Sequence, residues 1–258
     1  MRIVDVHCHL ESSEFDGALD HVVGEARKAG IVAMITASIQ PQQWEVSRTI
    51  AKRFPDVKFA CGIHPWYLNE SYLRRIDDLA EAREWGAVGI GEIGLDKKIS
   101  NTDFDLQMQF FSRQLAVARE INLPVIIHCR GAFNELLSIL RSEGVPQTGG
   151  VVHAFSGSPE IAADLGDLGI CVSMGGTLTM RNSKKREMAL KEVYPDRFML
   201  ESDAPDIPPI QAKGGINYPH YIRYSLAAAA EILGESESAV ADQTTRNAAR
   251  VFNLHIPQ

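Results

Sequence analysis

The stretch VDVHCHL, residues 4–10, reads as a buried β-strand that ends in polar side chains. Side chains alternate between the two faces of a strand, so we expect Asp5, His7 and His9 on one face and Cys8, with the valines, on the other. Two imidazoles and a carboxylate on one face of a single strand need polar partners from elsewhere in the chain.

Apolar, β-branched runs like this one recur along the whole chain. The strand candidates are residues 2–7, 31–37, 57–64, 87–93, 124–129, 150–155, 170–176 and 197–203. Helical periodicity fills several of the gaps between them, at residues 17–30, 42–54, 104–122 and 132–144.

Strands that alternate with helices indicate βαβ units with parallel, buried strands. Eight such strands in 258 residues predict an α/β fold, a closed (β/α)₈ TIM barrel. An open doubly wound sheet is the alternative, but no Gly-rich dinucleotide fingerprint follows the first strand. No linker-like tract divides the chain, so we expect a single domain over residues 1–258.

Composition limits the partners of the protein. A formal net charge of -7 and a pI of about 5.6 predict no broad attraction to nucleic acid or anionic membranes, so a polyanionic substrate needs a local basic patch. The four cysteines lie in apolar runs without metal or disulfide spacing and are expected to be buried, reduced thiols. Neither a signal peptide nor a membrane span is recognisable, which predicts a cytoplasmic protein, and no obligate protein partner is indicated.

Ionisable residues occur at the carboxyl ends of most of the expected strands. They are His7, His9, His64, Glu92, Asp96, His128, Arg130, His153, Glu201 and Asp203. In a barrel all these ends gather on one face, so residues from position 7 to position 203 converge. Neutral imidazoles together with carboxylates are the ligands that a divalent metal ion needs, and Glu92 has two oxygens with which to bridge two ions.

Seven motifs on these residues resemble the TatD family of metal-dependent hydrolases, within the amidohydrolase superfamily. They are DVHCHLE (5–11), GIHPW (62–66), GEIGLD (91–96), IHCRGA (127–132), HAFSGS (153–158), LESDAP (200–205) and TTRNAARVFNL (244–254). The resemblance implies a barrel with one or two divalent metal ions (Zn²⁺, Mn²⁺ or Mg²⁺). It also implies hydrolysis of phosphoester bonds, typically as a 3′→5′ DNase.

The resemblance also implies which residues hold the ions. One ion would be held by His7, His9, Glu92 and Asp203, and the other by Glu92, His128 and His153. The chain departs from the usual family pattern at Glu11, Trp66, Lys97 and Ala154, none of which is an expected ligand. These departures leave the metal chemistry intact and concern the substrate.

The expected mechanism is hydrolysis by a water molecule that the ions acidify. Asp203 is the candidate general base, with a plain ligand role as the alternative, and Glu92 is the other candidate catalytic residue. His64 and Arg130 are the candidate substrate-binding residues, because a guanidinium forks onto a phosphate and His64 either donates to it or completes a metal shell. Asp5 is expected to orient an imidazole; the alternative is a buried carboxylate bonded to backbone.

A basic run after the seventh strand could supply the patch that the acidic chain otherwise lacks. It contains Arg181, Lys184, Lys185 and Arg186. Trp66 and Tyr67 are candidates for stacking on a base. Either group has an ordinary alternative, a solvated helix face for the basic run and packing beside Pro65 for Trp66.

The function that these residues predict is a metal-dependent phosphodiesterase acting on DNA ends. One competitor is a hydrolase of a small phosphoester, ester, lactone or amide that uses the same metals, since barrels host many chemistries. The other is a binding module whose metals only stabilise the fold.

Overall fold

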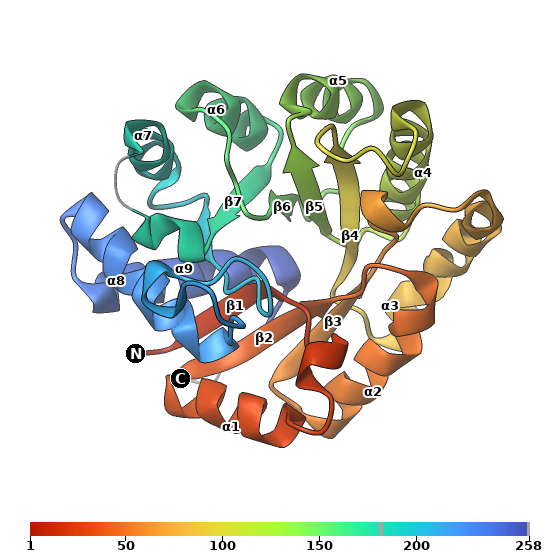
Figure 1. Ribbon diagram of the computed structural model, residues 1–258. Coiled ribbons are helices and arrows are strands. Elements are labelled where there is room, and N and C mark those ends of the chain that lie inside the picture. Colours follow the sequence, from red (N-terminus) through yellow and green to blue (C-terminus); the bar gives the residue numbers. More distant parts are fainter. Residues whose placement is uncertain (181–182, 257–258) are drawn as a thin grey trace.

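Eight parallel strands form the centre of the computed structural model, which describes residues 1–180 and 183–256 (Figure 1). Arg181 of the basic run lies outside the described residues. The strands are β1 (Ile3–Cys8), β2 (Ile31–Ala37), β3 (Val57–Cys61), β4 (Gly89–Asp96), β5 (Val125–Arg130), β6 (Gly150–Val152), β7 (Ile170–Met174) and β8 (Phe198–Leu200). Each lies within or across one of the runs expected from the sequence.

The strands follow one another around the sheet in chain order, and every neighbouring pair is parallel. The segment after β8 closes the ring onto β1, because the amide of Asp203 donates to the carbonyl of His7 (3.0 Å) and the amide of His9 donates to Ala204 (2.7 Å). The predicted TIM barrel is therefore confirmed, and the open sheet is excluded.

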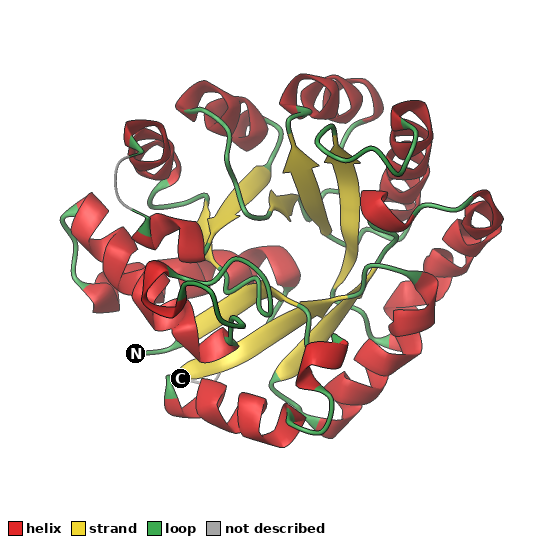
Figure 2. Ribbon diagram, viewed as in Figure 1, coloured by secondary structure: helices red, strands yellow, loops and turns green. Residues whose placement is uncertain are grey.

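Helices surround this barrel on its outer side (Figure 2). The α-helices are α1 (Leu19–Lys28), α2 (Trp44–Arg53), α3 (Ala82–Trp85), α4 (Phe104–Glu120), α5 (Phe133–Glu143), α6 (Pro159–Asp167), α7 (Lys184–Val193), α8 (Ile222–Leu233) and α9 (Glu237–Phe252). The four helical runs expected from periodicity became α1, α2, α4 and α5. The crossover between β3 and β4 is mostly a 3₁₀ helix, Glu70–Glu81, which precedes the short α3.

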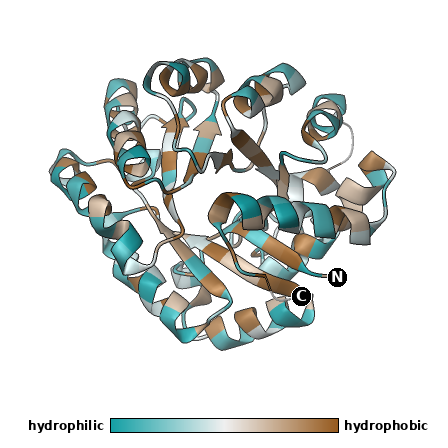
Figure 3. Ribbon diagram, turned by 180° about the vertical axis from the view of Figure 1, so that it is seen from behind, coloured by the Kyte–Doolittle hydropathy of each residue, from teal (hydrophilic) through white to brown (hydrophobic). Residues whose placement is uncertain are grey.

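Two hydrophobic clusters fill the space on either side of the strands. The larger packs the outward faces of the strands against the surrounding helices. The smaller joins inward residues such as Val4, Val6 and Met199 to Val251 and Phe252 of α9. Because α9 also donates to backbone carbonyls just before and within β8, it covers the amino-terminal end of the barrel (Figure 3). The opposite, carboxyl-terminal end is left for the site.

β1 departs from the strict alternation expected of it. Val6 lies in the inner cluster, but Cys8 lies in the outer one, and the pairing of β1 with β2 shifts between Asp5 and Cys8. The expectation that Cys8 shares a face with the valines was wrong, because this irregularity turns the end of the strand.

All four cysteines are buried and free. No described helix is long and apolar enough to cross a membrane.

Candidate metal centre

Glu92, on β4, lies at the middle of the barrel mouth, and one of its oxygens faces the two histidines of β1. Its Oε2 is 3.3 Å from Nε2 of His7 and 3.5 Å from Nε2 of His9. Oδ1 of Asp203 approaches the same pair, at 3.4 Å from His7 and 3.8 Å from His9. These four residues form the first group.

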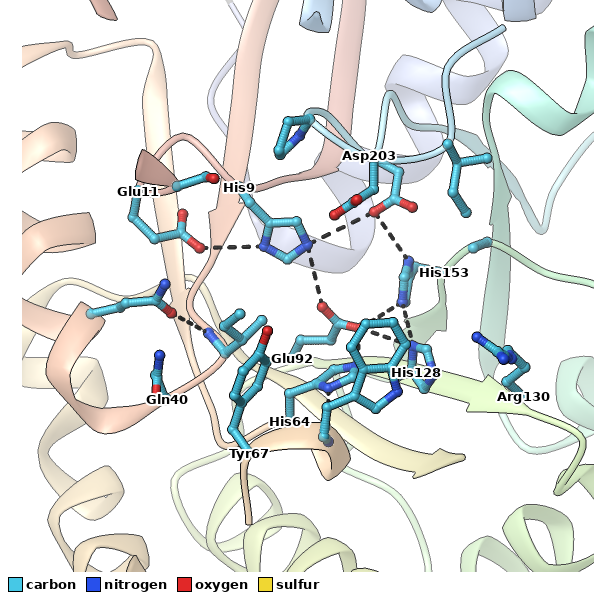
Figure 4. A pocket seen from close by; sticks show the side chains of 18 of the residues that line it. His9, Glu11, Gln40, His64, Tyr67, Glu92, His128, Arg130, His153 and Asp203 are labelled. Atoms are coloured by element: carbon cyan, nitrogen blue, oxygen red, sulfur yellow. Dashed lines mark hydrogen bonds and ion pairs between the residues drawn. The ribbon is translucent and has the colours of Figure 1, made fainter. Parts of the chain in front are cut away.

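The other oxygen of Glu92 faces three histidines from three different strand ends (Figure 4). Its Oε1 is 2.7 Å from Nε2 of His153, 3.0 Å from Nε2 of His64 and 3.1 Å from Nδ1 of His128. These residues form the second group. His153 also turns its Nδ1 toward Asp203 (3.9 Å), so it lies between the groups.

A pocket of about 590 Å³ opens above the two groups. Its lining includes every candidate ligand except His7, which is fully buried beneath them, and both candidate substrate-binding residues, His64 and Arg130. The structure therefore brings all the site residues expected from the sequence to one place.

Glycines allow the backbone around Glu92 to pack this closely. A Cβ at Gly62, directly after β3, would lie 2.7 Å from the Gly91 carbonyl carbon and 2.8 Å from the backbone oxygen of Glu92. Gly94 has a φ of 148°, and a Cβ there would collide with the His128 carbonyl. A Cβ at Gly91 would lie 2.6 Å from the Cβ of Ile126, so the motif GEIGLD owes both its glycines to the close approach of β5 to β4, and Gly62 allows the same approach on the β3 side.

Two non-glycine residues of the site have left-handed backbones: Ala154 (φ 43°), which follows His153, and Asp203 itself (φ 59°). Such conformations cost about 1–3 kcal/mol each and persist where surrounding contacts impose them. The Ala154 amide donates to Glu201 (2.7 Å), and buried Asn217 donates through Nδ2 to the carbonyls of Ser202 (2.6 Å) and Asp206 (2.7 Å). These bonds hold the segments that present His153 and Asp203.

The donor set fits divalent ions. Three buried imidazole nitrogens of the site, both of His7 and Nδ1 of His153, have no hydrogen-bond partner among the described residues. Buried polar atoms are nearly always satisfied, so such atoms need an explanation. A cation at Nε2 of His7, within reach of carboxylates of Glu92 and Asp203, would supply a partner there.

Hydrogen bonds at the far side of two imidazoles prepare them as ligands. Nδ1 of His9 faces the Ala37 carbonyl (2.8 Å) and Glu11 (3.3 Å), and Nε2 of His128 faces Asp96 (3.1 Å). Since these partners are acceptors, each far nitrogen carries the proton. In the neutral form of each ring, the nitrogen that faces Glu92 then keeps a lone pair for a metal.

His64 has the opposite arrangement. Its Nδ1 accepts the backbone N–H of Trp66 (3.1 Å), so the proton of the neutral ring lies on Nε2, which faces Glu92. Burial lowers the pKa of His64 to about 4, which favours this neutral form. A protonated nitrogen does not ligate a metal, and the geometry therefore supports a donor role for His64.

The charges of the site favour cations. Burial raises the pKa of the Glu92 carboxyl, but the surrounding imidazoles, His153 foremost, bring it well below its usual range. The pKa of the Asp203 carboxyl is likewise lowered, because His7 and His153 outweigh the effect of burial. Both carboxylates are ionised at neutral pH.

Three imidazoles of the site are basic when no ion is bound. Burial lowers the pKa of His7, but Glu92 and Asp203 outweigh it and raise the value well above its usual range. Burial lowers the pKa of His9 and of His128, but Glu11 beside His9, and Asp96 and Glu92 beside His128, outweigh it and raise both values to about 9. Metal binding therefore has to displace protons.

Asp5 does not orient an imidazole, so this expectation was wrong. Its carboxylate accepts from the backbone N–H of His7 (3.3 Å) and from the N–H (2.9 Å) and hydroxyl (2.5 Å) of Ser202. It ties β1 to the segment after β8, and the alternative expectation, a buried carboxylate bonded to backbone, is the one that the structure confirms.

Asp96 performs the orienting role instead. Its Oδ2 accepts from Nε2 of His128 and from the indole N–H of Trp66 (2.7 Å), and its Oδ1 accepts from the Lys98 amide (2.7 Å). The sequence placed Asp96 at a strand end, but no spacing links it to His128 or Trp66. Glu11 and Asn217 were missed as supporting residues for the same reason.

The rim of the pocket is basic on one side. Arg130 is about half exposed, with its Nε 3.7 Å from Oδ1 of Asp96. Of the described basic run, Lys185 reaches the rim, donating to the carbonyl of the pocket residue Ser156 (2.7 Å), whereas Lys184 and Arg186 line a separate hollow between α7 and α8.

Comparison with known proteins supports the same assignment. The profile of the family described as TatD related DNase matches residues 4–253. The uncharacterized metal-dependent hydrolases YabD of Bacillus subtilis and YcfH of Escherichia coli are 31% and 33% identical, over 98% of this chain and 100% and 97% of theirs. The crystal structure of the TatD homologue YjjV from Escherichia coli superposes with a TM-score of 0.92 at 29% identity, over 98% of this chain and 99% of that one. The chain belongs to the TatD-related DNase family and is a metal-dependent hydrolase.

Proposed function

We propose that the protein is a divalent-metal-dependent phosphodiesterase that removes nucleotides from the 3′ ends of DNA. The observation that carries this proposal is Glu92, whose two oxygens each face a separate group of imidazoles. Two ions held side by side suit the displacement at a phosphodiester, in which both the attacking and the leaving oxygen need stabilisation.

Each group supplies a set of ligands. We assign the first ion to His7, His9, Glu92 and Asp203 and the second to Glu92, His128 and His153, because these imidazoles face the two oxygens of Glu92. When bound, such ions acidify a water molecule and neutralise charge on the phosphoryl oxygens. Membership of a hydrolase family speaks against a purely structural role for them.

Asp203 is the proposed general base. Its carboxylate is ionised, lies at the floor of the pocket and is fixed by its backbone bond to His7 and by the bonds of Asn217 around it. A base held in this way is ready to take the proton of the attacking water.

His64 and Arg130 are the proposed phosphate-binding residues. The Nε2–H of His64 points into the cluster from its buried ring, and the exposed fork of Arg130 stands at the rim beyond His128. The neutral imidazole of His64 can donate one hydrogen bond and the guanidinium of Arg130 can donate two, and together they fit the oxygens of a single phosphodiester.

Trp66 and Tyr67 form an aromatic wall of the same pocket. Their side chains are exposed, and the Trp66 indole is anchored by Asp96. A rigid indole beside the scissile position suits stacking on a base.

A small ester, lactone or amide is the second candidate substrate class. Among the described residues that line the pocket, Arg130 is the one lysine or arginine, and a volume of about 590 Å³ suits a small molecule. Charge reversal of Lys185, the member of the described basic run that reaches the pocket rim, separates the two candidates: salt-dependent binding that is lost on reversal favours DNA.

The direct test uses metal-stripped protein and end-labelled single-stranded DNA, with Mg²⁺, Mn²⁺ or Zn²⁺ added back. We expect nucleotide release that requires a metal and disappears in Asp203→Ala, the control for contaminating nuclease. Protein that binds the ions but cleaves no DNA would refute the nuclease proposal and direct the search to small esters, lactones and amides.

A further inference from the structure

The wall of the pocket contains a carboxylate that the chemistry above does not use. Asp206 lies three residues beyond Asp203, in the loop after β8, and is part of the pocket lining. Among the described residues, no hydrogen bond or ion pair engages its side chain. This exposed, unpaired carboxylate places a negative charge at the mouth of a site for anionic substrates, and that charge disfavours any further anionic group that lies against it.

The position of this carboxylate is fixed by its backbone. The Asp206 amide donates to the Asp203 carbonyl (2.7 Å), and its own carbonyl accepts from the buried Asn217 side chain. The Asn217 amide in turn donates to the carbonyl of Pro205 (3.0 Å). Asp206 is therefore held at a constant offset from the candidate general base, as a specificity residue needs to be.

The basic groups of the rim lie at a different part of the mouth. Arg130 ends β5, the Lys98 side chain runs beside the adjoining Gly131, and Lys185 bonds to Ser156 after β6. In the strand order, β6 and β7 separate β5 from β8, which leads to Asp206. The pocket is thus polarised, with cations toward β5 and β6 and a free anion after β8.

A DNA strand fits this polarity in one direction. With the scissile phosphate at Glu92, the remaining strand carries further phosphates and is accommodated toward Arg130, Lys98 and Lys185. The terminal nucleoside carries no further phosphate and lies toward Asp206. We infer that Asp206 selects 3′ ends that are free hydroxyls, because its carboxylate accepts a hydrogen bond from that hydroxyl and repels a terminal phosphate.

This inference rests on the proposed nuclease function, and the test separates the two. Two 5′-labelled single strands of one sequence, ending in a 3′-hydroxyl or a 3′-phosphate, are digested by wild type, Asp206→Asn and Asp206→Ala with the activating metal. Asp105→Asn makes the same charge change on the exposed first turn of α4 and is the matched control.

We expect wild type and Asp105→Asn to cleave the 3′-hydroxyl strand at least about tenfold faster than the 3′-phosphate strand, with a smaller ratio at high salt. Asp206→Asn should bring this ratio toward one, chiefly by accelerating cleavage of the 3′-phosphate strand, because an amide oxygen still accepts a hydrogen bond but no longer repels. Asp206→Ala should in addition slow the 3′-hydroxyl strand. A folding defect would slow both strands alike.

Equal cleavage of both strands by wild type overturns the inference and leaves the nuclease function standing. A ratio that persists in Asp206→Asn overturns the assignment to Asp206. Absence of cleavage of either strand with every metal overturns the nuclease function, and the inference with it.

Discussion

Asp96→Asn is the substitution that most sharply tests how the second group of ligands is supported. The buried carboxylate accepts three hydrogen bonds, from His128 and Trp66 on one oxygen and from the Lys98 amide on the other. An asparagine side chain has the same shape as aspartate, but it has one oxygen that accepts and one NH₂ that donates. In either orientation of the amide, the NH₂ group faces at least one of these N–H groups, so a buried donor is left without a partner.

The magnitude follows from these contacts. A buried donor that loses its partner costs about 1–3 kcal/mol, so the free energy of unfolding should fall by that amount. Removing the group that orients a metal-ligating imidazole typically weakens metal affinity by about 10–100-fold. We expect this loss for the ion held by His128 and not for the ion held by His7 and His9, which Asp96 does not contact.

Calorimetric titration of metal-stripped protein with Mn²⁺ measures both affinities, and denaturant unfolding measures the stability. Asp105→Asn, exposed on α4, is again the matched control and should behave as wild type. The reasoning is refuted if Asp96→Asn binds both ions with wild-type affinity, or if the affinity for both falls equally.

Three further predictions test other parts of the site. Burial raises the pKa of Asp5 from 3.8 to about 7, so between these values the folded chain retains a proton that the unfolded chain releases. The free energy of unfolding of wild type, relative to that of Asp5→Asn, should therefore fall as the pH rises from about 4 to about 7. A difference between the two proteins that does not change with pH would contradict this. Because the pKa values of His9 and His128 are raised to about 9, metal binding at pH 7 should release protons, and the metal affinity should increase as the pH rises. Calorimetric titrations in buffers of different ionisation enthalpy measure this release. A binding enthalpy that does not depend on the buffer, or an affinity that does not depend on pH, argues against these ligands. Gly62→Ala places a Cβ 2.7–2.9 Å from the backbone around Glu92, so it should lower the free energy of unfolding by about 1–3 kcal/mol and reduce activity. The control Gly24→Ala places its Cβ in open space on α1 and should not lower stability. Equal thermal unfolding of the two variants would exclude the clash.

The barrel and the convergence of its ligands were predictable from the sequence. Parallel strands place their carboxyl ends on one face, so His7 and Asp203, though 196 residues apart, had to meet once eight strands were recognised. The resemblance of the motifs added the division of ligands into two sets. The structure then showed how Glu92 turns one oxygen to each group.

The supporting residues were not predictable in this way. Asp96 ends β4 and contacts His128 on the neighbouring β5 and Trp66 in the turn after β3, and Asn217 fixes the Asp203 segment from a stretch without periodicity. The prediction for Asp5 was wrong because alternation assumes a regular strand, and β1 is irregular beyond that residue. The proton position on His64 depends on a backbone N–H of the turn that follows it, which no residue pattern specifies.

The central claim is that Glu92 bridges two ions, with His64 left as a donor. Anomalous diffraction from crystals soaked in Mn²⁺ tests it most directly, because each ion gives its own peak. We predict two peaks, one among His7, His9, Glu92 and Asp203 and one among Glu92, His128 and His153, with Nε2 of His64 outside ligand distance of both. A single peak, a peak that Glu92 does not touch, or an ion ligated by His64 would contradict the account.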